Sequence, residues 1–224
     1  FMILGHGALS ALNTGDSPSA GKFLKRMASY LISARPVDQG FYHSLIAHHA
    51  LLSGKITQAA SHAELMWKKG KDVGFPVLDY VYHMENAYIM HALGEHEKTS
   101  YYMEQSYRIS QSMKSKPFEF MCLLADTQFA FDRGEDERGM VSLRKAMAFG
   151  REHGYTTAYI WFPKVMAGLC YKALEAGIET GYVQDLIRKR NIFPEAPPVE
   201  IEDWPWAIKI YTLGRFGLVR DGRP

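Results

Sequence analysis

Stretches with the apolar spacing of an amphipathic helix fill most of residues 2–191, and glycines separate them at nearly regular intervals. These glycines are Gly15, Gly54, Gly94, Gly134 and Gly177, which lie 39, 40, 40 and 43 residues apart. Each has a small residue seven positions before it (Ala8, Ala47, Ala87, Thr127, Cys170) and an apolar residue nine positions after it (Leu24, Ala63, Met103, Leu143, Leu186). Glycine adopts the left-handed turn that ends a helix, and small residues let two antiparallel helices approach closely. The pattern therefore predicts repeated helix pairs.

The predicted fold is all-α. We expect a right-handed α-solenoid of about four to five antiparallel helix pairs in repeats of about forty residues. The helices are expected at 2–14, 17–34, 37–53, 56–72, 77–93, 96–114, 117–133, 136–152, 156–176 and 179–191. Pro36, Pro76 and Pro117 stand where new pairs begin, because proline is well tolerated in a first helical turn. In a solenoid each pair is expected to contact only its neighbours.

The C-terminal residues follow a different pattern, so the solenoid is expected to end at residue 191. Residues 192–206 hold four of the ten prolines and an acidic run, which is typical of a semi-rigid linker. Residues 207–224 alternate apolar and polar side chains and contain β-branched residues, which predicts two short strands with an Asp221-Gly222 turn after them. A lone hairpin is marginally stable, so we expect it to open a second, truncated domain.

The turn glycine and the small residues around it resemble the tetratricopeptide (TPR) pattern, although this repeat is longer than 34 residues. Residues 1–191 are similar to the sensor region of MalT-like, ATP-dependent transcriptional activators. The tail looks like the junction into the winged-helix domain of bacterial SARP/BTAD activators, through Ile210, Leu213, Gly214, Phe216 and the range 220–222. The resemblance implies a multidomain bacterial regulator with an upstream ATPase and a downstream DNA-binding domain.

Composition and charge narrow the function classes only slightly. Hydrophobic residues make up 47% of the chain and charged residues 22%, and the net charge is +2, so no strong global field indicates nucleic acid. Cys122 and Cys170 are the two cysteines, which fits a reducing, cytoplasmic compartment and predicts buried, inert thiols. No apolar run reaches membrane-spanning length. Because residue 1 is phenylalanine, we expect a piece of a longer protein.

The candidate catalytic motifs are weak. The range 15–22 resembles a phosphate-binding loop, but five residues separate its glycines and Phe23 follows the lysine, so Asp16 or Ser17 is expected to cap a helix instead. The histidine spacings match no metal-binding motif, and no nucleophile motif is visible. We therefore expect no cofactor, no metal and no enzymatic activity.

The concave surface is the better candidate for a site, because the first helix of each pair lines it in such repeats. Aromatic and hydrogen-bonding side chains can anchor a peptide or a small polar ligand there, although any of them could instead pack between repeats. The predicted groove residues are Ser44, His48, Met84, Tyr88, His91, Gln128, Phe131 and Tyr171. Trp204 and Trp206 are expected to pack on the last helices or on the missing domain, and in the first case to couple the sensor to the DNA-binding domain.

Two function classes follow. The first is a non-catalytic sensor or scaffold domain that binds an effector or a partner protein in the concave face and couples it to oligomerisation and DNA binding. The alternative is a general TPR-type interaction module that binds a peptide or a second copy of itself, without a small ligand. In both cases DNA would be contacted only through the missing domain, and no membrane is involved.

Overall fold

The computed structural model describes residues 1–194, 198–213 and 216–220. In this part of the chain there are ten α-helices, one short 3-10 helix and one hairpin of two strands. The helices of the first three pairs are α1 (Met2–Asn13), α2 (Ser17–Ala28), α3 (Pro36–Leu52), α4 (Ile56–Gly70), α5 (Pro76–Ala92) and α6 (His96–Ser112). The last two pairs are α7 (Lys116–Asp132), α8 (Asp136–His153), α9 (Pro163–Glu175) and α10 (Thr180–Arg190).

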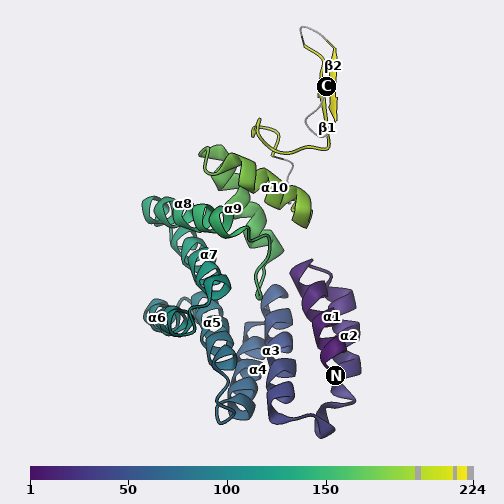
Figure 1. Cartoon of the computed structure of the whole chain (residues 1–224), viewed down its shortest axis with the longest axis vertical. Helices are drawn as coiled ribbons and strands as arrows, with labels where there is room; N and C mark the ends of the chain where they lie inside the picture. Colours follow the sequence, from purple (N-terminus) through teal and green to yellow (C-terminus); the bar gives the residue numbers. More distant parts are fainter. Residues whose placement is uncertain (195–197, 214–215, 221–224) are drawn as a thin grey trace.

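The helix pairs follow one another in an arc, so the predicted all-α helical repeat is confirmed (Figure 1). Within each of the first four pairs the two helices pack on each other, and α1, α3, α5 and α7 also contact in succession. These first helices form the inner side of the arc. All five turn glycines have the predicted left-handed backbone, with φ between 63° and 76°. The repeat therefore has the physical basis that the sequence suggested.

The small residues seven positions before each turn glycine are completely buried, as the close approach of paired helices requires. The prolines also act as expected, since Pro36 and Pro76 each occupy the first residue of a helix and Pro117 the second. Asp16 caps α2 by accepting a hydrogen bond from the Ser19 backbone N–H at 3.0 Å. The range 15–22 is thus an inter-helix turn, as predicted in place of a phosphate loop.

Gly139, five residues after the fourth turn glycine, shows how tightly the pairs pack. A Cβ atom at this position would lie 2.6 Å from the Phe131 ring. We therefore expect Gly139→Ala to lower the free energy of unfolding by about 1–3 kcal/mol, because the added carbon overpacks the interface. Gly168→Ala is the matched control, since nothing lies within 4 Å of its Cβ position, and it should stabilise by up to about 1 kcal/mol. Urea denaturation followed by circular dichroism measures both, and equal effects would contradict this packing.

Two expected helices are shorter than the apolar spacing suggested. The helix expected at 17–34 ends at Ala28 and continues as the 3-10 helix Leu31–Ser33. Ser29 and Ser33 donate hydrogen bonds to the backbone carbonyls of Arg26 and Tyr30, and such local bonds compete with helix continuation.

The helix expected at 156–176 begins only at Pro163, and this correction matters most for function. Gly154 ends α8 with a left-handed backbone, and residues 155–162 are not helical. Phe162 has an extended backbone because the residue before a proline is restricted away from the helical region. Figure 1 shows this loop reaching from the start of α9 into the middle of the arc. We call residues 155–162 the inserted segment.

The first and last pairs meet across the arc, which differs from the expectation that each pair contacts only its neighbours. The Asn13 side chain, at the end of α1, donates to the backbone oxygens of Ala158 and Tyr159 at 3.3 and 3.4 Å. The Arg190 guanidinium, at the end of α10, donates to the Asn13 backbone oxygen at 3.1 Å. The inserted segment supplies most of this bridge, and its presence could not be inferred from a repeat period.

Residues 201–206 pack back on the solenoid. Trp204 is buried in the main core, and Trp206 packs against the same core with its ring centroid 6.3 Å from that of Trp204. Gln184 on α10 donates to the Asp203 backbone oxygen at 2.8 Å. Both tryptophans therefore lie against the solenoid, which is the first of the two placements expected for them.

A two-stranded antiparallel hairpin ends the described chain, as expected. It consists of β1 (Ile208–Tyr211) and β2 (Gly217–Arg220), with Ile210 opposite Leu218. The hairpin projects beyond the helices, and the side chains of Ile208, Ile210 and Leu218 are exposed. The expected turn at Asp221-Gly222 lies outside the described residues.

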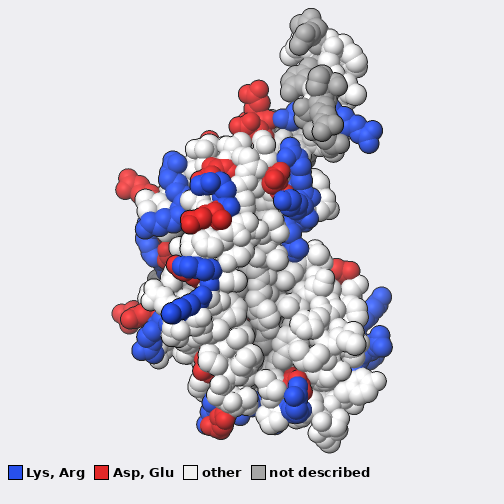
Figure 2. All heavy atoms as spheres, viewed as in Figure 1, with Lys and Arg blue, Asp and Glu red and all other residues white. Residues whose placement is uncertain are grey.

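In the described ranges no helix combines the length and the apolar character needed to cross a membrane. Side chains of both charge signs lie next to one another along the face shown in Figure 2. Cys122 and Cys170 are completely buried, and burial raises the pKa of each thiol to about 12, so both are protonated and inert as predicted.

Candidate ligand-binding site

The inserted segment covers the part of the concave face that lies between α3 and α5. His48 on α3 donates from Nε2 to the Trp161 backbone oxygen at 3.3 Å, and its ring meets the Phe162 ring edge-on. Burial lowers the pKa of His48 to about 4, so its imidazole is neutral at physiological pH. The Arg190 guanidinium lies over the Trp161 ring, 5.5 Å from its centroid. These contacts hold the segment in place from both ends of the arc.

A carboxyl group is enclosed beneath this segment. Ser44 donates from its hydroxyl to Glu85 Oε1 at 2.7 Å, while Glu85 Oε2 has no partner among the described residues. Glu85 is completely buried, and this burial raises its pKa to about 8, partly offset by the hydrogen bond from Ser44. Burial also raises the pKa of Tyr159, with the nearby Glu85 contributing. The carboxyl is therefore protonated at neutral pH and closed off from solvent.

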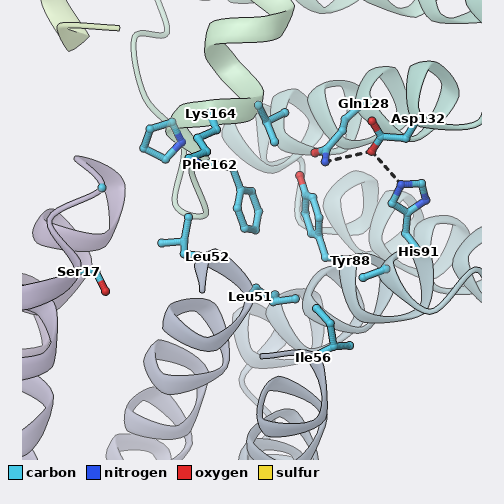
Figure 3. A pocket seen from close by; sticks show the side chains of 14 residues that line it. Ser17, Leu51, Leu52, Ile56, Tyr88, His91, Gln128, Asp132, Phe162 and Lys164 are labelled. Carbon is cyan, nitrogen blue, oxygen red and sulfur yellow. Dashed lines mark hydrogen bonds and ion pairs between the residues drawn. The ribbon is translucent and has the colours of Figure 1, made fainter. Parts of the chain in front are cut away.

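An open pocket of about 470 Å³ lies beside the inserted segment (Figure 3). It is bounded by the turn after α1, the end of α3, the start of α4, α5, α7 and the start of α9. Its lining residues are Gly15, Ser17, Leu51, Leu52, Ile56, Tyr88, His91, Ala92, Gln128, Asp132, Phe162, Pro163, Lys164 and Val165. Volume and lining match those of small-molecule sites, which are mostly apolar with a few placed polar groups.

Three polar side chains of the lining gather on one wall of the pocket. Asp132 Oδ2 accepts from His91 Nε2 at 2.9 Å and from Gln128 Nε2 at 3.3 Å. His91 also stacks on Phe129 with ring centroids 4.2 Å apart, which fixes the imidazole. These three residues come from α5 and α7, so the wall joins two successive repeats. Figure 3 shows them at one end of the pocket, with Lys164 toward the other.

Aromatic side chains form the centre of the pocket. The rings of Tyr88 and Phe162 lie 4.5 Å apart at an interplanar angle of 44°. Burial raises the pKa of Tyr88 far above its usual value, so its phenol remains a neutral group. Phe162 belongs to the inserted segment. This segment therefore covers the part of the concave face between α3 and α5 and also lines the open pocket beside it.

The structure brings three of the eight predicted groove residues together. Tyr88, His91 and Gln128 line the open pocket. Ser44, His48 and Met84 are buried beside the inserted segment instead: Trp161 and Phe162 lie against His48 and Met84, and Ser44 lies beside Glu85 and Tyr159.

The other two predicted groove residues lie elsewhere. Phe131 packs against the Gly139 position, with the Lys172 ammonium over its ring at 4.4 Å. Tyr171 donates to Glu200 Oε1 at 2.7 Å, which fastens the segment after α10. Neither residue belongs to the pocket lining, since contacts between neighbouring repeats and with the C-terminal segment occupy their side chains.

Several lining residues were not among the sequence candidates. Asp132 lies four residues after Gln128, on the same side of α7, and this helical spacing was the signal for it. Phe162 and Lys164 flank Pro163, which begins α9 just as Pro36 and Pro76 begin theirs. If Pro163 is taken as another helix start, the expected helix no longer includes residues 156–162. Their position in the concave face still does not follow from the sequence.

The part of the chain that the structure describes holds no cluster of three or more histidine, cysteine, aspartate or glutamate side chains able to bind a metal ion. His43 and His62 face each other through their Nδ1 atoms at 3.0 Å, with burial as the main cause that lowers the pKa of each. This pair joins α3 to α4 and lies outside the pocket lining.

Comparison with protein-family models, with curated proteins and with solved structures found no match to this chain. The geometry of the pocket therefore carries the functional argument.

Proposed function

We propose that this chain is a non-catalytic sensor domain whose concave pocket binds a small organic effector. The observation that supports it is the pocket between α3, α5, α7 and the start of α9, which is large enough for a metabolite and lined by an apolar floor with polar groups at its ends. Solenoid repeats commonly use their concave side for binding. As in the sequence-based resemblance, the sensor would belong to a bacterial transcriptional regulator.

The same geometry favours a small effector over an extended peptide. A peptide would follow the concave face across several repeats, but Trp161 and Phe162 already occupy the stretch over His48 and Met84. The remaining open volume of about 470 Å³ is that of a compact ligand. The general peptide-binding module thus becomes the less favoured alternative.

The pocket also offers a physical route for coupling. Phe162 lines the pocket, and the adjacent Trp161 lies under the guanidinium of Arg190 at the end of α10. A ligand that fits one position of the inserted segment better than another would shift the balance between the two positions by its difference in affinity. The segment after α10, anchored by Trp204, would receive that shift.

A catalytic role has less support. A strongly shifted carboxyl pKa often marks an active site, and Glu85 has one. However, Glu85 is completely buried and is not among the pocket-lining residues. We attribute its pKa to enclosure beneath the inserted segment rather than to chemistry on a substrate.

Filling the pocket tests the proposal. The purified chain is screened by thermal shift against a metabolite library, because a ligand that binds the native state raises the melting temperature. We expect Ala92→Trp to abolish the shifts produced by the hits, since the indole occupies the pocket. Leu93→Trp is the matched control, because Leu93 is exposed and lies outside the lining. No hits, or hits that persist in Ala92→Trp, would overturn the proposal.

A further inference from the structure

We infer that the effector of this pocket carries a protonated amine on an apolar body, and that Asp132 receives the amine. This inference rests on the proposed function and adds the chemical class of the ligand. Two charged side chains belong to the lining, the Asp132 carboxylate and the Lys164 ammonium. Figure 3 shows them toward opposite ends of the pocket. A cation beside Asp132 is therefore kept away from the lysine.

The hydrogen bonds of Asp132 leave it able to accept more. Among the described residues its partners are His91 Nε2 and Gln128 Nε2, which both donate to the same oxygen, Oδ2. The orientation of the Gln128 amide follows from this arrangement, since its oxygen would repel the carboxylate. No described residue donates to Oδ1, and the Asp132 side chain is 48% exposed, so a ligand can reach it. The carboxylate is thus fixed in position and accessible from the pocket.

The rest of the wall is rich in acceptors. In a neutral imidazole that donates from Nε2, Nδ1 is an acceptor, and the Nδ1 of His91 has no partner among the described residues. The same holds for Gln128 Oε1. Both atoms lie behind the pocket surface, where they add negative potential next to Asp132. A ligand that brings N–H donors and positive charge complements this wall, whereas a carboxylate or phosphate would be repelled.

The apolar and aromatic lining defines the rest of the ligand. Leu51, Leu52 and Ile56 form an aliphatic side, with the Tyr88 ring toward Gln128 and Asp132 and the Phe162 ring toward Lys164. Aromatic faces attract cations and also bury apolar rings. An aryl or alkyl amine therefore matches both parts of the pocket, with its ammonium at Asp132 and its apolar part against the leucines.

Three compounds with the same body test the class. The chain is titrated by calorimetry at pH 7 with 4-phenylbutylamine, 4-phenylbutanol and 4-phenylbutyrate. We expect the amine to bind about fivefold or more tightly than the alcohol, since a charge-assisted hydrogen bond at a half-exposed carboxylate contributes about 1 kcal/mol. The carboxylate should bind most weakly.

Asp132→Asn removes the negative charge of the side chain but keeps its shape. The asparagine oxygen can still accept hydrogen bonds from His91 and Gln128. The preference for amine over alcohol should fall to within about twofold, while binding of the alcohol is retained. Glu137→Gln is the control, since Glu137 is exposed at the start of α8 and outside the lining. The ligand tested here is a free amine and not the side-chain amine of a lysine in a peptide. A lysine-containing peptide that outcompetes 4-phenylbutylamine would overturn the assignment.

Failure of this inference differs from failure of the proposed function. Library hits that depend on an open pocket at Ala92 but show no amine preference would overturn the ligand class and leave the sensor proposal standing. An amine preference that persists in Asp132→Asn would overturn the role of Asp132. Absence of binding by all three phenylbutyl compounds at millimolar concentration would also overturn the class.

Discussion

Trp161→Ala should lower the free energy of unfolding by about 3–5 kcal/mol, the usual cost of removing a buried aromatic side chain. Trp161 is only 2% exposed, and its backbone oxygen accepts from His48 while its ring lies under Arg190. The substitution leaves a cavity in the middle of the arc and frees the inserted segment. It therefore weakens contacts to the second and the last helix pairs at once.

Two measurements check this result. Urea denaturation gives the loss of stability, with Trp67→Ala as the control, because Trp67 is half-buried and stacks on Tyr82 between neighbouring pairs. We expect the control to cost about 1–2 kcal/mol. Hydrogen exchange should show faster exchange around His48 in Trp161→Ala alone. A loss below about 1 kcal/mol would mean that the segment does not hold the arc together.

Stability should fall as the pH rises from about 6.5 to 8, because Glu85 takes up a proton on folding. Its pKa is about 8 in the folded chain and near 4.5 in the unfolded chain, so within this window the unfolded carboxyl is ionised and the folded one is largely protonated. Unfolding releases that proton, which lowers stability by up to about 1.4 kcal/mol per pH unit. The contribution of Glu85 to this loss is up to about 2 kcal/mol across the window, and it levels off above the folded pKa.

Glu85→Gln should flatten this pH dependence. Glutamine can accept the Ser44 hydrogen bond but does not titrate, so the stability of this variant should no longer fall between pH 6.5 and 8. Glu104→Gln, at an exposed position of α6, should keep the dependence of the original chain. A flat profile in the original chain, or an unchanged slope in Glu85→Gln, would contradict the burial of a protonated carboxyl.

Below about pH 6.5 the histidines act in the opposite direction. Burial lowers the pKa of His48 and of His43 to about 4, so both stay neutral in the folded chain while the unfolded chain protonates them near pH 6.5. Their contribution to stability is present above the unfolded pKa and is lost as the pH falls toward 4. The expected stability maximum therefore lies close to pH 6.5.

The repeat was predictable from sequence because its determinants are local. A glycine such as Gly94 must adopt a positive φ, and the small residue Ala87 must lie where two helices touch, so both leave a periodic trace. The inserted segment has no such periodic signal in the sequence, because its contacts are with Asn13, His48 and Arg190, which are distant along the chain. Local spacing records which face of a helix is buried, but not which residues cover it.

The candidate site also contains residues that local spacing predicted and residues that it did not. Tyr88, His91 and Gln128 were found because the concave face of each first helix follows from the repeat. Their neighbours Ser44 and His48 share that face, yet the inserted segment covers them. Glu85 was not a candidate, because nothing in a helical pattern marks a glutamate whose carboxyl lies beneath a loop from a later repeat. Burial from elsewhere in the chain decides which positions of a predicted face remain free.

The contact of Arg190 with Asn13 has a consequence for how the chain unfolds. Open repeat arrays unravel from their ends, because a terminal repeat is held by one neighbour only. Here the two terminal pairs hold each other, so neither can peel away without breaking contacts at both ends of the sequence. The array should behave as a closed ring that melts in a single step, and its folding should wait for the slow joining of its distant ends.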